Sequence, residues 1–207
     1  ADARRFMSAD GAVREGQGAV RYAARGLELH GKTVALVGFG AIAGHVAEIA
    51  GRGLGMRVLA YSPSVPNEVF TSHDVMRRTD IHAMLGEADV VSLHRPSNAR
   101  DPFVMDTQAF AMLRPGAILV NTSRGGAVDR AALIAALEEG RLAGAALDVL
   151  PEEPPAPDDP LLRAPNLILA PHLGAATEEA LRRMAMMCAR QVLDVLAGRD
   201  PPHIVRP

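Results

Sequence analysis

The chain has 207 residues, of which 48% are hydrophobic, and a formal net charge of −2. This length and apolar content suit one large domain of the α/β kind with a sizeable core. Acidic and basic residues are nearly balanced, so charge gives no reason to expect nucleic acid or an anionic membrane as a partner. A single cysteine excludes internal disulfides, and no early apolar run resembles a signal peptide or a membrane span. We therefore expect a cytoplasmic protein.

Residues 1–29 are predicted to form an arm or linker helix outside the core. Helix-compatible stretches at Asp2–Met7 and Ala12–Ala24 are interrupted by glycines, and the chain begins at Ala1 without a methionine, which suggests processing or a longer parent sequence. The arm carries apolar residues that a single sheet domain does not need, namely Phe6, Met7, Val13, Val20 and Tyr22. Exposed apolar surface of this kind is typical of an interface. We expect a homodimer that pairs through this arm and the domain that follows it; an arm that folds back or is disordered is the alternative.

Residues 33–44, TVALVGFGAIAG, are predicted to form a strand, a glycine turn and a helix. The apolar run Thr33–Val37 is typical of a strand buried on both faces, and Gly38 and Gly40 end it. Two glycines one residue apart let the backbone approach a pyrophosphate, and the N–H groups that begin the following helix attract phosphate. Ala43 replaces the third glycine of the usual fingerprint, which tolerates it. A merely tight strand-to-helix turn is the alternative.

Beyond this turn, strands and helices alternate, which predicts a Rossmann-type doubly wound parallel sheet with helices on both faces. Further strands are predicted at Arg57–Tyr61, near Val75, and at Asp89–Leu93, Ala117–Val120, Ala145–Val149 and Leu167–Ala170. Further helices are predicted near Ile81–Leu85 and after the capping residues Asp106, Asp129 and Thr177. The Pro-containing stretch after Tyr61 is predicted to be irregular, and Leu150–Pro165 to be a proline-rich loop. Cys188 lies on the apolar face of the last helix, which predicts a buried, inert thiol.

Four polar residues lie at or just beyond the carboxyl ends of predicted strands: Arg124, Asp148, Glu153 and His172. Each alone has an ordinary explanation, as a surface cation, a cap, a solvated loop charge or a hydrogen-bonded histidine. In an open parallel sheet, however, ligands bind at this edge. Their joint placement beside a phosphate-binding turn indicates a ligand site.

The strings VGFGAIAG, VSLHRP, ILVNTSRGGAVD, GAALDVLPEEP and APHLGAAT occur in this order. Together they resemble the D-isomer-specific 2-hydroxyacid dehydrogenases, the family of phosphoglycerate dehydrogenase and glyoxylate/hydroxypyruvate reductase. The resemblance covers the chain from Leu27 to Ile204. It implies an enzyme that transfers a hydride between NAD(P)H and a small 2-oxo acid or D-2-hydroxy acid. The alternative is a non-catalytic NAD(H)-sensing or scaffold domain of the corepressor type.

The resemblance also implies catalytic roles. Arg124 would hold the substrate carboxylate, because a guanidinium matches it in two parallel hydrogen bonds. His172, with an ordinary pKa of about 6.5, would donate and accept the proton at the carbonyl oxygen. Glu153 would be its partner and favour the imidazolium. These three residues favour the enzyme over the sensor.

The family likewise implies a set of cofactor-binding residues: Gly38, Gly40, Ala41, Ile42, Ser62, His94, Pro96, Thr122, Ser123, Asp148 and Gly174. For His94, a packed histidine without ligand contact is an equal alternative. The other histidines show no metal-ligand spacing, and we expect no metal site.

Two features depart from the family pattern. Ser62 stands where an acid usually binds the adenosine ribose, so NADP is possible, although NAD stays narrowly ahead because no arginine follows nearby. Residues 30–198 are predicted as the NAD(P)-binding domain and 199–207 as a tail toward a substrate domain that this chain lacks. Without that domain we expect the isolated chain to be poorly active, since closure and exclusion of water suffer.

Overall fold

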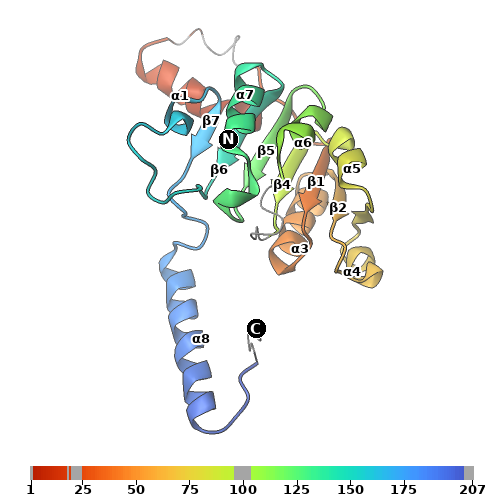
Figure 1. The fold of residues 1–207 in the computed structure, drawn as a ribbon, viewed down its shortest axis with the longest axis vertical. Coiled ribbons are helices and arrows are strands. Elements are labelled where there is room, and N and C mark those ends of the chain that lie inside the picture. The colour runs from red at the N-terminus through yellow and green to blue at the C-terminus, as the bar shows by residue number, and fades with distance from the viewer. Residues whose placement is uncertain (1, 18, 20–24, 96–103, 203–207) are drawn as a thin grey trace. The chain divides into compact units, whose positions relative to one another are not determined.

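A computed structural model describes the chain except for residues 1, 18, 20–24, 96–103 and 203–207 (Figure 1). The chain divides into two compact units, Ala1–Pro171 and His172–Pro207, and each is described by itself. The first unit holds the sheet and the second holds one long helix.

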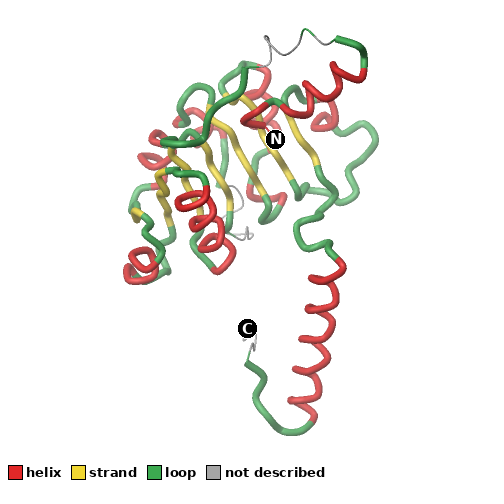
Figure 2. Tube along the Cα trace, turned by 180° about the vertical axis from the view of Figure 1, so that it is seen from behind, coloured by secondary structure: helices red, strands yellow, loops and turns green. Residues whose placement is uncertain are grey.

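The described part of the first unit forms a parallel, seven-stranded sheet in the order β3-β2-β1-β4-β5-β6-β7. Its strands lie side by side in Figure 2. They are β1 (Thr33–Val37), β2 (Arg57–Tyr61), β3 (Met76–Arg77), β4 (Val90–Leu93), β5 (Ala117–Asn121), β6 (Leu142–Leu147) and β7 (Leu167–Leu169). The chain starts at β1 in the middle, moves to one edge, and then crosses back to β4. This order confirms the predicted doubly wound Rossmann-type fold.

Helices cover both faces of the sheet, because successive strand residues point to opposite sides. On β1, Val34 and Leu36 belong to one buried cluster, with α3 (Ala41–Glu48), the π-helical turn η2 (Ile49–Gly53) and α4 (Asn67–Ser72). Ala35 and Val37 belong to the other cluster, with α5 (Ile81–Glu87), α6 (Thr107–Met112) and α7 (Arg130–Glu138). The described residues of this unit also form three 3-10 turns, namely η1 (Asp2–Arg4), η3 (Gly125–Ala127) and η4 (Pro160–Arg163).

Several predicted boundaries are confirmed and others are wrong. The side chains of Asp106 and Asp129 cap α6 and α7 as expected. The stretch after Tyr61 is not wholly irregular, because α4 begins after Pro66. The predicted strand Ala145–Val149 lies at Leu142–Leu147 instead, since small residues blur its apolar signal. In the arm, α1 (Phe6–Arg14) runs through Gly11, which was expected to interrupt it.

The second unit contains α8 (Glu178–Leu196), whose first turn is capped by the Thr177 hydroxyl, 3.1 Å from the Ala180 backbone nitrogen. No residue of α8 is buried, and the prediction of a buried Cys188 is wrong because this thiol is exposed. In the described part of this unit α8 is the only helix, so no other element of the unit covers its apolar face. Among the residues that the structure describes, no helix combines the length and apolarity needed to cross a membrane.

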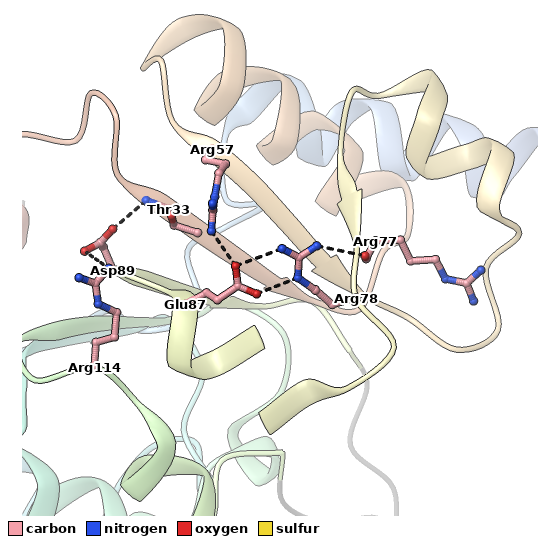
Figure 3. Close-up of polar contacts among 7 residues, drawn as sticks. All are labelled: Thr33, Arg57, Arg77, Arg78, Glu87, Asp89 and Arg114. Carbon is pink, nitrogen blue, oxygen red and sulfur yellow. Dashed lines mark hydrogen bonds and ion pairs between the residues drawn. The ribbon is translucent and has the colours of Figure 1, made fainter. Parts of the chain in front are cut away.

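Two acidic residues, Glu87 and Asp89, form hydrogen bonds with the first residues of β1 and β2 (Figure 3). Glu87, at the end of α5, accepts hydrogen bonds from Arg78 at 2.8 and 3.0 Å and from Arg57 at 2.7 Å. Asp89 accepts from the Thr33 backbone N–H at 2.8 Å and pairs with Arg114 at 3.3 Å. Thr33 and Arg57 are the first residues of β1 and β2, so this ionic cluster lies at the end of the sheet opposite the glycine turn.

Candidate functional site

The glycine turn follows β1 at the carboxyl end of the sheet. Gly38 has a φ of 91° and its N–H donates to the Tyr61 carbonyl oxygen at 2.8 Å. A Cβ at this position would lie 2.8 Å from the Arg95 nitrogen, which only glycine avoids. Gly40 begins α3, and a Cβ there would meet no atom within 4 Å. Open space therefore lies in front of the helix terminus, as a phosphate group requires.

Phe39, between the two glycines, points inward and holds the turn in place. Its ring is buried and stacks on Phe70 of α4, with centroids 4.8 Å apart and planes at 13°. The His73 ring meets Phe39 edge-on at 5.5 Å, and its Nδ1 lies 2.9 Å from the Val69 carbonyl oxygen. Helix α4, which the sequence did not predict, thus supports the turn through the contacts of Phe70 and His73 with Phe39.

A cavity of about 330 Å³ opens beside the turn. The two glycines line it together with residues that follow β2 and β4, among them Ser62, Ser64, His94 and Arg95. Its position, its two lining glycines and the adjacent helix terminus suit the adenosine and pyrophosphate parts of a dinucleotide. Ala41 and Ile42 begin the helix and are exposed, Ile42 to 69%.

His94 is half-buried in this cavity wall, with its Nε2 2.9 Å from the Ser92 hydroxyl. Burial lowers the pKa of His94 below its ordinary value, so the imidazole is neutral at pH 7. The ring is packed against Ser92 and also lines the cavity, so its contact with a ligand stays a prediction. The predicted neighbour Pro96 lies outside the described residues.

The turn after β5 carries Thr122, Ser123 and Arg124, and Asn121 organises it. The buried Asn121 side chain donates to the Arg124 carbonyl oxygen at 2.9 Å and accepts from the Ser123 N–H at 3.0 Å and hydroxyl at 2.8 Å. Arg124 is exposed, and its guanidinium donates to the Ser123 carbonyl oxygen at 2.7 Å. Sequence reasoning missed Asn121, although a buried amide at a strand end is a signal of such a turn.

The Arg124 turn packs against the segment that follows β6. A Cβ on Gly125 would overlap the Leu150 carbonyl carbon, so a glycine permits this close approach. Glu153 accepts from the Leu150 N–H at 2.9 Å, and the Asp148 N–H donates to the Asn121 carbonyl oxygen at 2.9 Å. The structure thus brings the segments that carry Arg124, Asp148 and Glu153 together at the carboxyl edge of the sheet.

His172 and Gly174 belong to the second unit, where His172 has a left-handed φ of 56°. The pairing of His172 with Glu153 therefore stays a prediction. Within the described ranges, no group of three or more histidine, cysteine or acidic residues could hold a metal ion.

Known proteins resemble this chain in sequence and in fold. The chain is similar to glyoxylate reductase of Korarchaeum cryptofilum, with 41% identity over 99% of this chain and 62% of that protein. Among solved structures it is similar to D-lactate dehydrogenase with NAD+ from Lactobacillus jensenii, with 30% identity and a TM-score of 0.86 over 100% of this chain and 65% of that one. It is also similar to an acyclic imino acid reductase in complex with NADPH and D-Arg, with 28% identity and a TM-score of 0.88 over 99% of this chain and 64% of that one.

The chain therefore spans less than two thirds of each of these relatives. Residues 1–174 match the family described as D-isomer specific 2-hydroxyacid dehydrogenase, NAD binding domain. This match covers most of the chain, including the glycine turn, the Arg124 turn and the proline-rich loop. The chain belongs to the NAD-binding domain family of the D-isomer-specific 2-hydroxyacid dehydrogenases.

Proposed function

We propose that this chain is the cofactor domain of an oxidoreductase that moves a hydride between NAD(P)H and a small 2-oxo acid or D-2-hydroxy acid. One observation carries the proposal: the glycine turn after β1 and the Arg124 turn after β5 lie at the same carboxyl edge of the sheet, with only β4 between their strands. Parallel strands lie about 4.8 Å apart, so a dinucleotide held at the first turn extends toward the second.

Three residues that the family resemblance implies as catalytic have different roles in the proposed reaction. Arg124 holds the substrate carboxylate in a bidentate pair and so orients the 2-oxo carbon. His172 gives a proton to the carbonyl oxygen during reduction and takes it back during oxidation. Glu153 stabilises the imidazolium of His172. The nicotinamide cofactor, when bound, supplies or accepts the hydride.

The cofactor is NAD(H) or NADP(H). Gly38, Gly40 and the start of α3 surround the pyrophosphate, and Thr122, Ser123 and Asp148 border the nicotinamide half. Ser62, which is buried at the end of β2, bears no charge that would repel a 2′-phosphate. The relatives described above include complexes with NAD+ and with NADPH. NAD(H) remains the first expectation because no cation adjoins Ser62 in the sequence.

We expect two partners, a substrate bound at the proposed site and a second copy of the chain bound at the arm. The substrate is a small carboxylic acid, and a second copy of the chain pairs with the first through the arm. A cytoplasmic location remains our expectation from the single cysteine. The corepressor alternative gains no support from the three relatives above, two of which are named reductases and one a dehydrogenase.

Titration calorimetry with NADH and NADPH tests cofactor binding on the chain itself. Turnover is measured with the chain joined to a substrate domain, over a panel of small 2-oxo acids. His172→Gln should lower kcat by roughly a hundred- to ten-thousandfold with little change in the Kd for NADH. Arg124→Lys should raise KM, because an ammonium cannot form the planar fork.

The matched control is His82→Gln, which changes an exposed histidine on α5 and should leave turnover intact. Absence of binding to either cofactor at millimolar concentration would overturn the cofactor assignment. Undiminished turnover of His172→Gln or Arg124→Lys would overturn the catalytic roles.

A further inference from the structure

An arginine that follows a different strand lines the cavity beside the glycine turn. In the sheet, β2 and β4 lie on either side of β1. Ser62, which follows β2, and Arg95, which comes two residues after β4, therefore flank the glycine turn and line the same cavity. The contact is close, because a Cβ on Gly38 would lie 2.8 Å from the Arg95 backbone nitrogen.

The described residues that line this cavity include one cationic side chain and no anionic one. Among the described residues that line it, Arg95 is the only one charged at neutral pH, and none is an aspartate or glutamate. His94 is neutral there, because its burial lowers its pKa. Ser62 and Ser64 add two hydroxyl groups that can donate hydrogen bonds. A cavity whose described lining includes a guanidinium and two hydroxyl groups, and no acidic residue, is a suitable setting for a phosphate.

We propose that Arg95 determines cofactor specificity by binding the 2′-phosphate of NADP(H), with Ser62 and Ser64 completing the phosphate site. The chain then accepts NADP(H) in addition to NAD(H). This proposal rests on the proposed function, because it assumes that the cavity holds the adenosine end of a nicotinamide cofactor. The competing role for Arg95 is a contact with the pyrophosphate, which both cofactors share.

The two roles differ in what they predict for Arg95→Ala. Calorimetry on the purified protein would compare NADPH with NADH, and 2′,5′-ADP with 5′-ADP. For a 2′-phosphate contact, the variant should lose roughly ten- to hundredfold in affinity for NADPH and 2′,5′-ADP, as expected for a hydrogen bond to a charged group. Its affinity for NADH and 5′-ADP should change less than about threefold by the same reasoning. Arg95→Lys should retain part of the NADPH affinity, since it keeps the charge but not the fork.

The matched control is Arg52→Ala, which removes an exposed arginine that pairs with Glu48 at 3.2 Å and should leave all four affinities unchanged. Retained binding of 5′-ADP by Arg95→Ala shows that the variant is folded. Equal losses for NADH and NADPH would assign Arg95 to the pyrophosphate and overturn the inference. Wild-type protein that binds NADH but not NADPH would also overturn it, while leaving the proposed function standing. Wild-type protein that binds neither would overturn the proposed function itself.

Discussion

Asn121 fixes the shape of the turn on which Arg124 depends. Arg124 is exposed, and a long exposed side chain has many rotamers. Its backbone, however, is tied to the end of β5, because the buried Asn121 amide bonds the Arg124 carbonyl oxygen and both the N–H and the hydroxyl of Ser123. The guanidinium therefore starts from a defined position at the carboxyl edge of the sheet.

Replacement of Asn121 by alanine should weaken both the fold and the substrate site. The variant loses hydrogen bonds at a buried position, so its free energy of unfolding should fall by about 1–3 kcal/mol. The KM for the 2-oxo acid should rise, because Arg124 is no longer held. Urea denaturation and steady-state kinetics measure the two effects, with Asn67→Ala, at an exposed position of α4, as the control. An unchanged KM in a folded Asn121→Ala protein would count against this role.

At the scale of elements, the strands and the capped helices could be predicted because their signals are local. An apolar run or an acidic cap such as Asp106 is visible in a few residues. Helix α4 was missed because it has six residues, follows a proline-containing stretch, and buries only Phe70. Cys188 was misjudged because an apolar helix face predicts burial only where another element covers it.

Glu87 joins three elements, since it ends α5 and bonds Arg57 on β2 and Arg78 after β3. The hydrogen bonds from Arg78 and the charges of both arginines hold the pKa of Glu87 below its ordinary value. A lowered folded-state pKa means that the ionised carboxylate stabilises the fold above the ordinary glutamate pKa. That stabilisation is lost as the pH falls through the lowered value.

Glu87→Gln should therefore reduce the free energy of unfolding at pH 7, and the deficit should shrink on acidification. We expect a difference of about 1 kcal/mol or less, because the Glu87 side chain is 35% exposed and solvent screens the pairs. Urea denaturation between pH 7 and pH 3 measures it. Glu138→Gln, at an exposed position of α7, is the control. A deficit that stays the same across this pH range would show that the carboxylate charge is not its cause.

At the scale of the whole chain, the sequence shows which residue follows which strand, but not which strands are neighbours. Ser62 and Arg95 are more than thirty positions apart in the printed sequence, and only the order β2-β1-β4 brings them to one cavity. The same is true of Gly125 and Leu150, whose close contact depends on the pairing of β5 with β6. Polar residues that follow predicted strands, such as Arg124 and Asp148, indicated the edge for the candidate site, whereas the tertiary contacts at that edge required the structure.

The arm offers an apolar surface of the kind that a second subunit would cover. No residue of α1 is buried, and Phe6, Met7 and Val13 are 60%, 57% and 61% exposed. The arm also has a defined attachment, because η1 contacts β6 and the Leu27 N–H donates to the Ala3 carbonyl oxygen. The other apolar arm residues, Val20 and Tyr22, lie outside the described residues. A two-fold pairing would bring the same patch of both subunits together.

Light scattering should therefore report a homodimer for the chain and a monomer after removal of residues 1–25. The reason is that an exposed apolar surface gains free energy when a partner removes it from water, by about 25 cal/mol per Å². Replacement of Phe6 and Met7 by serine provides a milder variant, which should weaken the dimer without shortening the chain. Arg14→Ala, on the same helix at an exposed ion pair with Asp10, is the matched control and should remain dimeric. A monomer at tens of micromolar with the arm intact would contradict the predicted dimer. A dimer that survives removal of the arm would show that the subunits pair through another surface.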